Sequence, residues 1–384
     1  MEEFCVKLLF VSDSFKGSLT SEETVELLDK AARKVFGACE TQGFSVADGG
    51  EGFVDAVIKA CDGERIYREV HGPLGETVKA YYGAVGDTAI IEMAQASGLT
   101  LVRPEDRDPR LTTTYGTGEL IMDAVSRGYK SIHIAIGGSA TNDGGMGFAK
   151  AIGIRFLDTA GTELSGRGAD LGLVDRIDMS GLDPRLSEVD FTVMCDVQNP
   201  LCGPDGATYT FGKQKGGTPE ILDELERGMQ HYCNVITKEF GADPQAVPGT
   251  GAAGGLGVAL FVFLKAKMQS GIESMLELIE FDKKLDGVDL VVTGEGQTDW
   301  QSCFGKVMQG VGDHCKNKGI PAVALCGSLG EGYDQIYEHG ISSLMTTVDS
   351  PMTVEHAMSE ARDLYLKAAI RMFRFIKTGM EIRN

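Results

Sequence analysis

The chain has 384 residues, which is enough for two domains of ordinary size. Its hydrophobic fraction of 42% and charged fraction of 24% are those of a globular protein and exclude a disordered or fibrous chain. The formal net charge of −20 opposes binding to nucleic acid or to an anionic membrane surface. An anionic small substrate would therefore need local cations, metal ions or backbone amides to hold it.

Cysteine usage and the N-terminal sequence predict a cytoplasmic protein. The nine cysteines are an odd number and form no CxxC pair, so neither a disulfide framework nor a zinc site is expected. The N-terminal sequence MEEFCVKLLFVSD starts with acidic residues and carries only a short apolar run, unlike a secretory signal. The longest uncharged run, 249–264, is shorter than the ~20 apolar residues of a membrane-spanning helix.

The first 60 residues alternate between strand and helix signals. The apolar run at 6–11 predicts a buried parallel strand that ends near Asp13. Thr20 and Glu23 form a capping-box pattern at the start of a helix. A second strand near 44–46 precedes another helix, so this part of the chain reads β-α-β-α.

The middle of the chain has a different pattern. Three strand-like segments, at 66–71, 78–85 and 88–93, are separated by connections short enough for antiparallel hairpins. Further on, we expect a helix from Thr117, strands at 132–136 and 191–196, and a long helix at 219–240. This mixture predicts a separate α+β domain.

The alternation of strands and helices resumes near residue 288. Strands are expected at 290–293, 322–326 and 343–347, with a helix at 306–318 and a last helix at 352–377. Because both chain ends are α/β, we expect one Rossmann-like parallel-sheet domain made of residues 1–67 and 286–384, and an inserted α+β domain over 68–285. A cleft between the two domains would be the natural active site.

The sequence IGGSATNDGGMG, at 136–147, is the most distinctive candidate site. Its first two glycines would let the backbone approach a ligand closely, and a helix is expected near Asp143, whose carboxylate would cap it. The candidate ligands of an anion or substrate hydroxyl are Gly137, Gly138, Ser139, Thr141, Asn142 and Asp143. A tight strand-to-helix turn is the alternative interpretation, since glycine-rich loops without a full motif are weak signals.

Charged residues follow the first predicted strand, where ligands of open α/β sheets bind. Asp13, Ser14 and Lys16 are the candidates in this loop, and Lys16 would meet a phosphate or the substrate anion. The alternative interpretation is a helix cap followed by a solvated lysine.

Two glycine-rich loops each carry a pair of carboxylates. Asp48 and Glu51 form one pair, and Glu295 and Asp299 form the other. Because Mg²⁺ takes few carboxylates together with phosphate oxygens and water, both pairs are candidate metal ligands. Capping and ordinary turns are the alternative roles for such acids.

Asp196 ends another apolar strand. A buried carboxylate there would orient or deprotonate a substrate hydroxyl, which is the general-base task of kinases that act on alcohols. An Asx turn before Pro200 is the alternative, and Asn199 in the same loop is a candidate substrate ligand. Lys213 and Lys215 follow as candidates for binding a carboxylate or phosphate.

Residues 249–254, GTGAAG, match the dinucleotide fingerprint GxGxxG but lack its context, because the two prolines before them exclude a strand. We interpret them as a helix entrance that could still bind phosphate through Gly254. By itself this fragment would suggest an NAD-dependent oxidoreductase. A non-catalytic two-domain protein that binds a small acid is a second alternative, against which the acids at strand ends argue.

Nine collinear segments resemble the bacterial glycerate kinase family. They are DSFKGS, ADGGEG, EMAQASGL, TTTYGTGEL, IGGSATNDGGMG, DVQNPLCG, FGKQKG, GTGAAGGLG and TGEGQTD, the last followed by GK. The resemblance implies ATP- and Mg²⁺-dependent phosphorylation of D-glycerate, usually at the 2-hydroxyl, by a two-domain protein unrelated to P-loop kinases. ATP and D-glycerate are then the expected partners, and a homodimer is left open.

These segments suggest a mechanism, stated as a hypothesis. Lys16 and the amides of the glycine loop at 136–147 would hold phosphate or the substrate anion, and Glu295 and Asp299 would hold Mg²⁺ directly or through water. Asp196 would take the hydroxyl proton. Phosphoryl transfer depends mostly on positioning and charge stabilisation, which fits such a set of groups.

Three positions depart from the pattern expected of the family. Gln297 stands where arginine is usual, Phe53 where threonine is usual, and Lys213 where proline is usual. Glutamine lacks both the charge and the fixed fork of arginine, so Gln297 removes a potential phosphate clamp. The change concerns affinity or substrate range more than the reaction itself.

Overall fold

The computed structural model describes residues 5–46, 52–303 and 305–382. The chain forms two compact units, one from Met1–Asp48 with Gly271–Asn384 and the other from Gly49–Ser270. We call them the terminal unit and the inserted unit. Among the described helices, none has both the length and the apolarity needed to cross a membrane.

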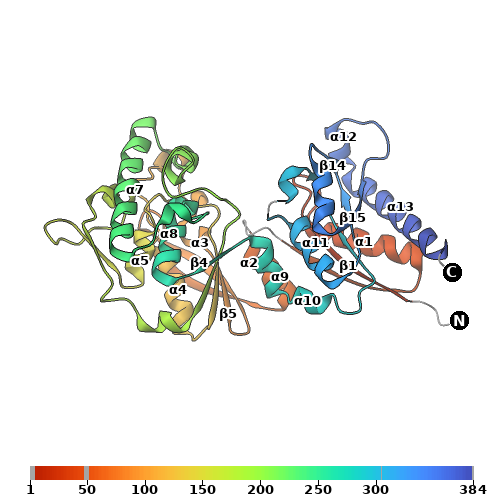
Figure 1. Cartoon of the computed structure of the whole chain (residues 1–384), viewed down its shortest axis with the longest axis horizontal. Coiled ribbons are helices and arrows are strands. Elements are labelled where there is room, and N and C mark those ends of the chain that lie inside the picture. The colour runs from red at the N-terminus through yellow and green to blue at the C-terminus, as the bar shows by residue number, and fades with distance from the viewer. Residues whose placement is uncertain (1–4, 47–51, 304, 383–384) are drawn as a thin grey trace. The chain divides into compact units, whose positions relative to one another are not determined.

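The terminal unit contains the predicted parallel sheet. Its strands are β1 (Val6–Ser12), β2 (Cys39–Ser45), β11 (Leu290–Thr293), β13 (Ala322–Cys326) and β15 (Ile341–Thr346), in the order β15-β13-β11-β1-β2. All four pairings are parallel. In Figure 1 the two ends of the colour scale come together in this unit, because its strands come from both ends of the chain. The Rossmann-like sheet built from both chain ends is therefore confirmed.

Helices cover both faces of this sheet. Leu8 and Phe10 share a buried core with residues of α1 (Ser21–Phe36) and α13 (Ala361–Ile382), which pack against each other. Because side chains alternate along a strand, the buried Leu9 faces the opposite side, and α11 (Val307–Lys318) contacts the sheet there. Burial on both faces explains why the strands appear in the sequence as continuous apolar runs.

The expected start of α1 is confirmed in detail. The Thr20 hydroxyl accepts a hydrogen bond from the Glu23 amide at 3.2 Å, and the Thr20 amide donates to the Glu23 carboxylate at 2.9 Å. This reciprocal pair satisfies backbone donors that the first turn leaves open. The smaller elements of the unit are α9 (Gly271–Leu278), α10 (Phe281–Lys284), α12 (Val354–Ser359) and the two-stranded parallel sheet of β12 (Gln297–Thr298) with β14 (Ser328–Leu329).

The inserted unit is built on a six-stranded mixed sheet. In spatial order its strands are β10 (Lys267–Gln269), β9 (Asp190–Met194), β6 (Ser131–Ala135), β5 (Thr88–Glu92), β4 (Thr77–Val85) and β3 (Glu64–His71). The strands β3, β4 and β5 pair antiparallel, as the short connections predicted, and β5, β6, β9 and β10 pair parallel. A small antiparallel pair joins β7 (Arg155–Leu157) to β8 (Arg176–Asp178).

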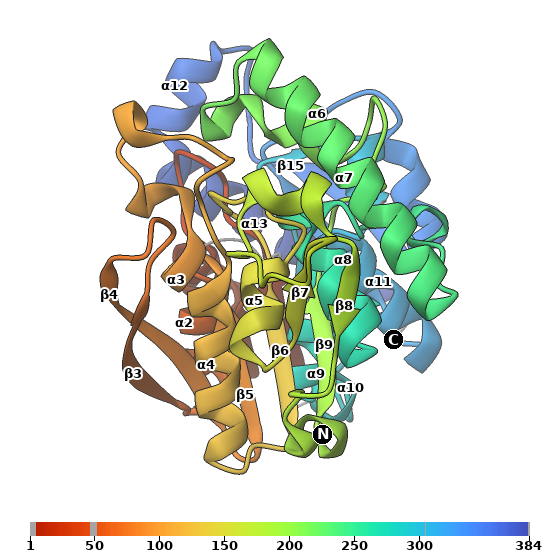
Figure 2. The ribbon, with the colours of Figure 1, turned by 90° about the vertical axis from the view of Figure 1, so that its left-hand side faces the viewer.

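Seven helices of the described chain belong to this unit. They are α2 (Phe53–Cys61), α3 (Ala94–Ser97), α4 (Tyr115–Ser126), α5 (Met146–Ala151), α6 (Ala207–Phe211), α7 (Pro219–Phe240) and α8 (Ala252–Leu264). Figure 2 shows α4 and α5 side by side in front of the sheet, and the two are in contact. The helix α7 has the predicted bounds, and Leu225, Met229, Tyr232 and Ile236 form its buried apolar face.

The first boundary between the units lies at 48/49, whereas the sequence placed it at 67/68. The difference arises from α2, which contacts β4 and β5 of the inserted unit. The Val54 amide at its start donates a 2.8 Å hydrogen bond to the buried carboxylate of Glu92. This contact joins positions 38 residues apart in the sequence, so local patterns could not reveal it.

The second boundary lies at 270/271, whereas the sequence placed it at 285/286. The segment between these points packs on α11. His314 of α11 lies 2.7 Å from the Asp282 carboxylate and 3.3 Å from that of Glu273, and its ring contacts the buried ring of Phe281. These contacts place α9 and α10 with the terminal unit.

The last predicted helix, at 352–377, consists of two helices. α12 and α13 are separated by Glu360, and α12 has no buried residue. Because the sequence around Glu360 contains neither proline nor glycine, it carries no signal that would end a helix there.

The ion pairs of His314 predict a pH-dependent contribution to stability. The carboxylates of Glu273 and Asp282 raise the pKa of His314 to about 9, and burial of the ring partly opposes this rise. The stabilisation is fully present below the unfolded pKa of about 6.5 and is lost as the pH rises through about 9. His314→Gln should lower the unfolding free energy by about 1–2 kcal/mol at pH 6 and by little at pH 10, measured by urea denaturation.

His356→Gln provides the matched control, because His356 is exposed on α12. It should shift the unfolding free energy by less than about 0.5 kcal/mol at either pH. An equal loss at pH 6 and pH 10 for His314→Gln would show that the contribution of His314 is packing and not charge.

Candidate active site

A cavity of about 610 Å³ lies at the carboxyl ends of the strands of the terminal unit. Its lining comes from the segments that follow β1, β11, β13 and β15, and from α12 and α13. In the strand order β2-β1-β11-β13-β15, β2 follows β1 in the chain and lies on one side of it. β11, where the chain returns to this sheet, lies on the other side of β1. This reversal is the topological switch point at which open α/β sheets bind ligands.

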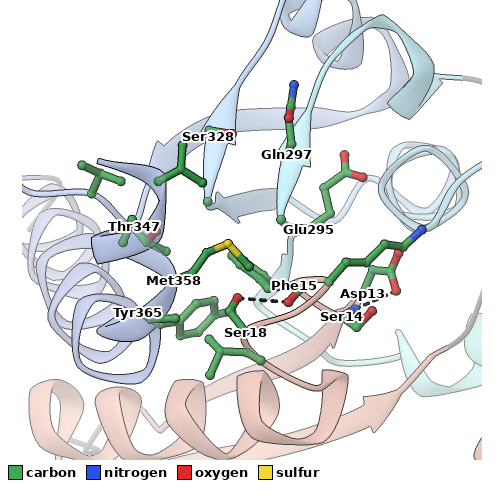
Figure 3. Close-up of a pocket in the computed structure, with 18 of the residues that line it drawn as sticks. Asp13, Ser14, Phe15, Ser18, Glu295, Gln297, Ser328, Thr347, Met358 and Tyr365 are labelled. Carbon is green, nitrogen blue, oxygen red and sulfur yellow. Dashed lines mark hydrogen bonds between the residues drawn. The ribbon is translucent and has the colours of Figure 1, made fainter. Parts of the chain in front are cut away.

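The structure brings five of the predicted site residues to this cavity: Asp13, Ser14, Lys16, Glu295 and Asp299. Figure 3 shows the loop after β1 beside the loop after β11, with Asp13 and Glu295 on the same side of the cavity. The Ser14 amide donates a 2.6 Å hydrogen bond to the Asp13 carboxylate, which fixes the start of its loop.

Close backbone approach holds the two loops together. A Cβ on Gly294 would lie 1.9 Å from the carbonyl oxygen of Leu325, so only glycine fits at this position. The Gly294 carbonyl accepts a 2.9 Å hydrogen bond from the Asp13 amide, and the Glu295 carbonyl accepts a 3.1 Å hydrogen bond from the Gly327 amide. The backbone of Glu295 is therefore fixed from both neighbouring strands.

Glu295 is the most buried carboxylate of the cavity, with 7% of its surface exposed. Burial raises its pKa, while a hydrogen bond from Ser302 and the charge of Lys306 oppose this rise. Its Oε1 atom makes no hydrogen bond with any described residue. A buried carboxylate oxygen without a partner is costly, which favours a bound cation or donor at this point.

Several residues of the cavity were not predicted. Lys306 lies in the GK that follows TGEGQTD, and Ser328 and Thr347 follow β13 and β15, so the rule that ligands bind at strand ends could have identified them. The apolar residues of α12 carried no such signal, because apolar spacing within a helix usually indicates core.

The glycine loop of the inserted unit follows β6 as predicted. Gly137 and Gly138 are exposed, and Gly138 has φ +73°. Ser139, Thr141 and Asn142, which follow them, are buried. The loop therefore has an exposed glycine pair and a buried polar part.

Asp143 is wholly buried and serves the loop itself. Its carboxylate accepts hydrogen bonds from the amide and hydroxyl of Thr114, both at 2.8 Å, and from the amides of Gly145 at 3.0 Å and Gly147 at 3.2 Å. Burial raises the pKa of this carboxyl and the four hydrogen bonds oppose the rise. Gly147 lies in the first turn of α5, so the Asp143 carboxylate binds the start of this helix, although the N-cap residue is Gly145 and not Asp143.

Lys215 is buried at 2% exposure, although a lysine at a loop would usually be solvated. Its Nζ donates hydrogen bonds to the Ser139 hydroxyl at 2.8 Å and to the Thr141 carbonyl at 2.6 Å. Burial lowers its pKa to about 7, and the charge of Asp143 opposes this shift. Lys213, its predicted companion, is exposed.

Two polar atoms of the buried loop have no hydrogen-bond partner among the described residues: Thr141 Oγ1 and Asn142 Oδ1. The amide nitrogen of Asn142 donates to the hydroxyl of Thr208 at 3.2 Å, which orients the side chain. Buried polar atoms are normally satisfied, so these two atoms are candidate ligand contacts.

Gly254 packs on the same loop. It has φ +66°, and a Cβ there would lie 2.0 Å from the Thr141 carbonyl oxygen. Its own carbonyl accepts a 2.9 Å hydrogen bond from the Gly144 amide. The segment before it contains a 3₁₀ turn, Pro244–Ala246, and no described strand, so GTGAAG lacks the βαβ context of a dinucleotide site, as expected.

Asp196 and Asn199 follow β9, the neighbour of β6 in the sheet. Asp196 is exposed, so the expectation of a buried carboxylate is wrong: the chain leaves the sheet after Met194 and enters a surface loop. Asn199 uses its side-chain amide within this loop, where it donates to the Asp205 carbonyl at 2.7 Å.

The predicted metal ligands fall into two groups. Glu295 and Asp299 line the cavity, whereas Asp48 and Glu51 lie outside the described residues. Within the described part of the chain, no group of three or more histidine, cysteine, aspartate or glutamate side chains is arranged to hold a metal ion. A site for Mg²⁺ would thus rely on one or two carboxylates together with ligand oxygens.

Comparison with known proteins identifies the family. The family model described as the glycerate kinase family matches residues 8–377. The chain belongs to the glycerate kinase family. The resemblance carried by the nine sequence segments is therefore confirmed, together with the enzyme class that it implies, a kinase. This membership argues against the oxidoreductase suggested by GTGAAG alone.

Individual relatives match over nearly their whole length. The chain is 44% identical to the glycerate kinase of Halalkalibacterium halodurans over 364 residues, which cover 94% of this chain and 96% of the relative. It is 42% identical to the glycerate 2-kinase of Escherichia coli, covering 98% and 99% of the two chains. A crystal structure of a protein assigned as glycerate kinase 2 from Salmonella typhimurium LT2 matches with a TM-score of 0.85 at 39% identity, covering 98% of this chain and 100% of that one.

The contact between Gly254 and the Thr141 carbonyl predicts a large loss of stability on substitution. Gly254→Ala should lower the unfolding free energy by about 2–4 kcal/mol, because the new Cβ would clash with backbone as well as strain φ. Gly241→Ala is the matched control: Gly241 has nearly the same φ, +65°, but open space around it, so about 1 kcal/mol is expected. Urea denaturation measures both, and equal losses would contradict a role for the contact.

Proposed function

We propose that this protein transfers the γ-phosphoryl group of ATP to a hydroxyl of D-glycerate, giving phosphoglycerate and ADP. The observation that carries the proposal is the cavity at the switch point, which gathers two lysines and three carboxylates in a chain that matches the glycerate kinase family over residues 8–377. The 2-hydroxyl is favoured, because the relative from Escherichia coli, 42% identical, is named glycerate 2-kinase.

We propose Glu295 and Asp299 as the residues that hold Mg²⁺. The free Oε1 of Glu295 and the carboxylate of Asp299 in the same cavity would suit a cation that also binds phosphate oxygens. When bound, Mg²⁺ would neutralise charge on the phosphates. Asp48 and Glu51 stay predictions as further ligands.

We propose Lys16 as the residue that holds a phosphate group in this cavity. In the inserted unit, the exposed amides of Gly137 and Gly138 and the buried groups of Ser139, Thr141 and Asn142 are proposed to hold the small acid. The predicted cleft between the domains stays a prediction.

Asp196 remains our proposal for the general base. Its exposure leaves the carboxylate accessible to a substrate. Asn199, which shapes the same loop, and Gly254, which packs on the glycine loop, are proposed to act through the backbone that they position.

A cytoplasmic location is also proposed. All nine cysteines lie among the described residues, and none of them forms a disulfide bond there. Free thiols persist in a reducing compartment, which supports the location expected from the sequence.

The reaction is tested by incubating the protein with Mg-ATP and D-glycerate and following the products by phosphorus NMR. We expect ADP and 2-phosphoglycerate in equal amounts, and the spectrum distinguishes the 2-phosphate from the 3-phosphate. Stabilisation by glycerate without release of ADP would instead indicate a binding protein. Reduction of NAD by glycerate, seen as absorbance of NADH, would indicate an oxidoreductase.

Asp196→Asn tests the proton acceptor. It should lower kcat by about 10²–10⁴-fold, because the amide cannot take the hydroxyl proton. The control is Asp190→Asn, which changes an exposed aspartate at the opposite end of the same strand and should leave kcat within about twofold. Near-normal turnover of Asp196→Asn would show that this residue is not the base.

Lys215→Met tests the buried lysine. Loss of its hydrogen bonds to Ser139 and Thr141, about 1.5–3 kcal/mol for a charged donor, should lower kcat/KM for glycerate by roughly 10–100-fold with KM for ATP nearly unchanged. Lys213→Met, at the exposed neighbour, should change neither parameter by more than about twofold. Equal changes in both KM values would contradict a role confined to the acid.

A further inference from the structure

We infer that the cavity of the terminal unit is the nucleotide site, and that the apolar side chains of α12 hold the purine base. This inference rests on the proposed kinase function and extends it, because it assigns ATP to one unit and to named contacts. Four features of the structure support it: the division of the cavity wall, the exposure of α12, the size of the cavity and the position of its cations.

The wall of the cavity has a charged part and an apolar part. The charged part consists of Asp13, Lys16, Glu295, Asp299 and Lys306, and the apolar part includes Leu19, Met352, Val354, Ala357 and Met358. Figure 3 shows Met358 and Tyr365 on one side and Asp13 and Glu295 on the other. A nucleotide has the same division, with a flat apolar base at one end and charged phosphates at the other.

α12 is unusual because its apolar side chains are exposed. Val354 is 70% exposed and Met358 is 42% exposed, although both line the cavity. They are four residues apart on a helix and so lie on the same face. Met358 reaches the loop after β1, where its Cε lies 2.9 Å from the position of a Cβ on Gly17. An exposed apolar face beside a polar rim is typical of a ligand site.

The apolar part has a firm base. The ring of Phe15 packs edge-on against that of Tyr365, with centroids 5.3 Å apart, and both residues are buried. A base inserted between this pair and α12 would thus meet one rigid and one adaptable surface. Methionine suits the second role, because its side chain is flexible and its sulfur contacts aromatic rings favourably.

The volume of the cavity, about 610 Å³, decides between the two substrates. Sites for ligands of drug size have about 300–1,000 Å³ and bury most of the ligand. A three-carbon acid would occupy a small part of this space and would leave the apolar wall uncovered, whereas a nucleotide would contact both parts.

The cations lie where the phosphates would be. Lys306 directly precedes α11, so the free amides of the first turn of this helix are close to it in the chain. A helix start and an adjacent lysine together favour a phosphate group. Lys16 lies in the loop that follows β1, the strand next to β11 at the switch point.

Binding of ADP tests the inference directly. Titration calorimetry in the presence of EDTA measures ADP affinity without metal and without turnover. We expect Val354→Glu and Met358→Glu each to weaken ADP binding at least tenfold, because a carboxylate would replace the apolar contact. In the kinase assay with Mg-ATP, KM for ATP should rise at least tenfold and KM for D-glycerate should stay within twofold.

Phe375→Glu is the matched control, since Phe375 is 73% exposed on α13 and does not line the cavity. It should leave ADP affinity and both KM values within twofold. Because α12 has no buried residue, the two test variants should keep the far-UV circular dichroism and the melting temperature of the wild type. If one of them did not fold, the other would carry the test.

The outcomes are distinguishable. Unchanged ADP affinity in both folded variants would overturn the inference, and so would a rise in KM for glycerate alone, which would assign the cavity to the acid. Weakened ADP binding in the two variants, together with a wild-type protein that does not phosphorylate glycerate, would support the nucleotide site and overturn the proposed function instead.

Discussion

The approach of backbone to backbone at the ends of parallel strands is the constraint on which both candidate sites depend. At Gly294 a side chain would lie 1.9 Å from the Leu325 carbonyl oxygen, and at Gly254 it would lie 2.0 Å from that of Thr141. Only glycine permits such contacts, and they fix the neighbouring functional groups, Glu295 in one unit and Asn142 in the other. At these two positions glycine thus serves the close packing of loops and not flexibility.

Local sequence patterns predicted most secondary elements, because each pattern has a local cause. The Thr20 capping box, the apolar run of β1 and the apolar face of α7 all depend on residues within a few turns or pleats. The unit boundaries depend on distant contacts instead: Glu92 binds the start of α2, and His314 binds α9 and α10. Such contacts leave no trace in a local pattern, so the predicted boundaries differ from the observed ones.

The same distinction applies to the candidate sites. The rule that ligands bind at strand ends brought Asp13, Glu295 and the glycine loop to attention, since topology alone decides where strands end. This rule could not predict which of the candidate side chains are buried. Asp196 follows a strand and is exposed, whereas Lys215 lies in a polar segment and is buried, because burial depends on which other segments pack over a residue. The apolar face of α12 was missed for a related reason, as helical apolar spacing does not tell a core from a cavity wall.

The net charge of −20 explains why burial of a few cations matters so much. An anion approaching the protein meets an unfavourable field, and an exposed lysine such as Lys213 is screened by water and salt, so it offsets little of it. Lys215 is enclosed and hydrogen-bonded to the loop that we propose for the acid, where the lower dielectric strengthens its field. Asp143, held by four donors, opposes the loss of that charge. A lysine placed inside the fold, while protonated, can therefore act on a bound anion more strongly than an exposed lysine does.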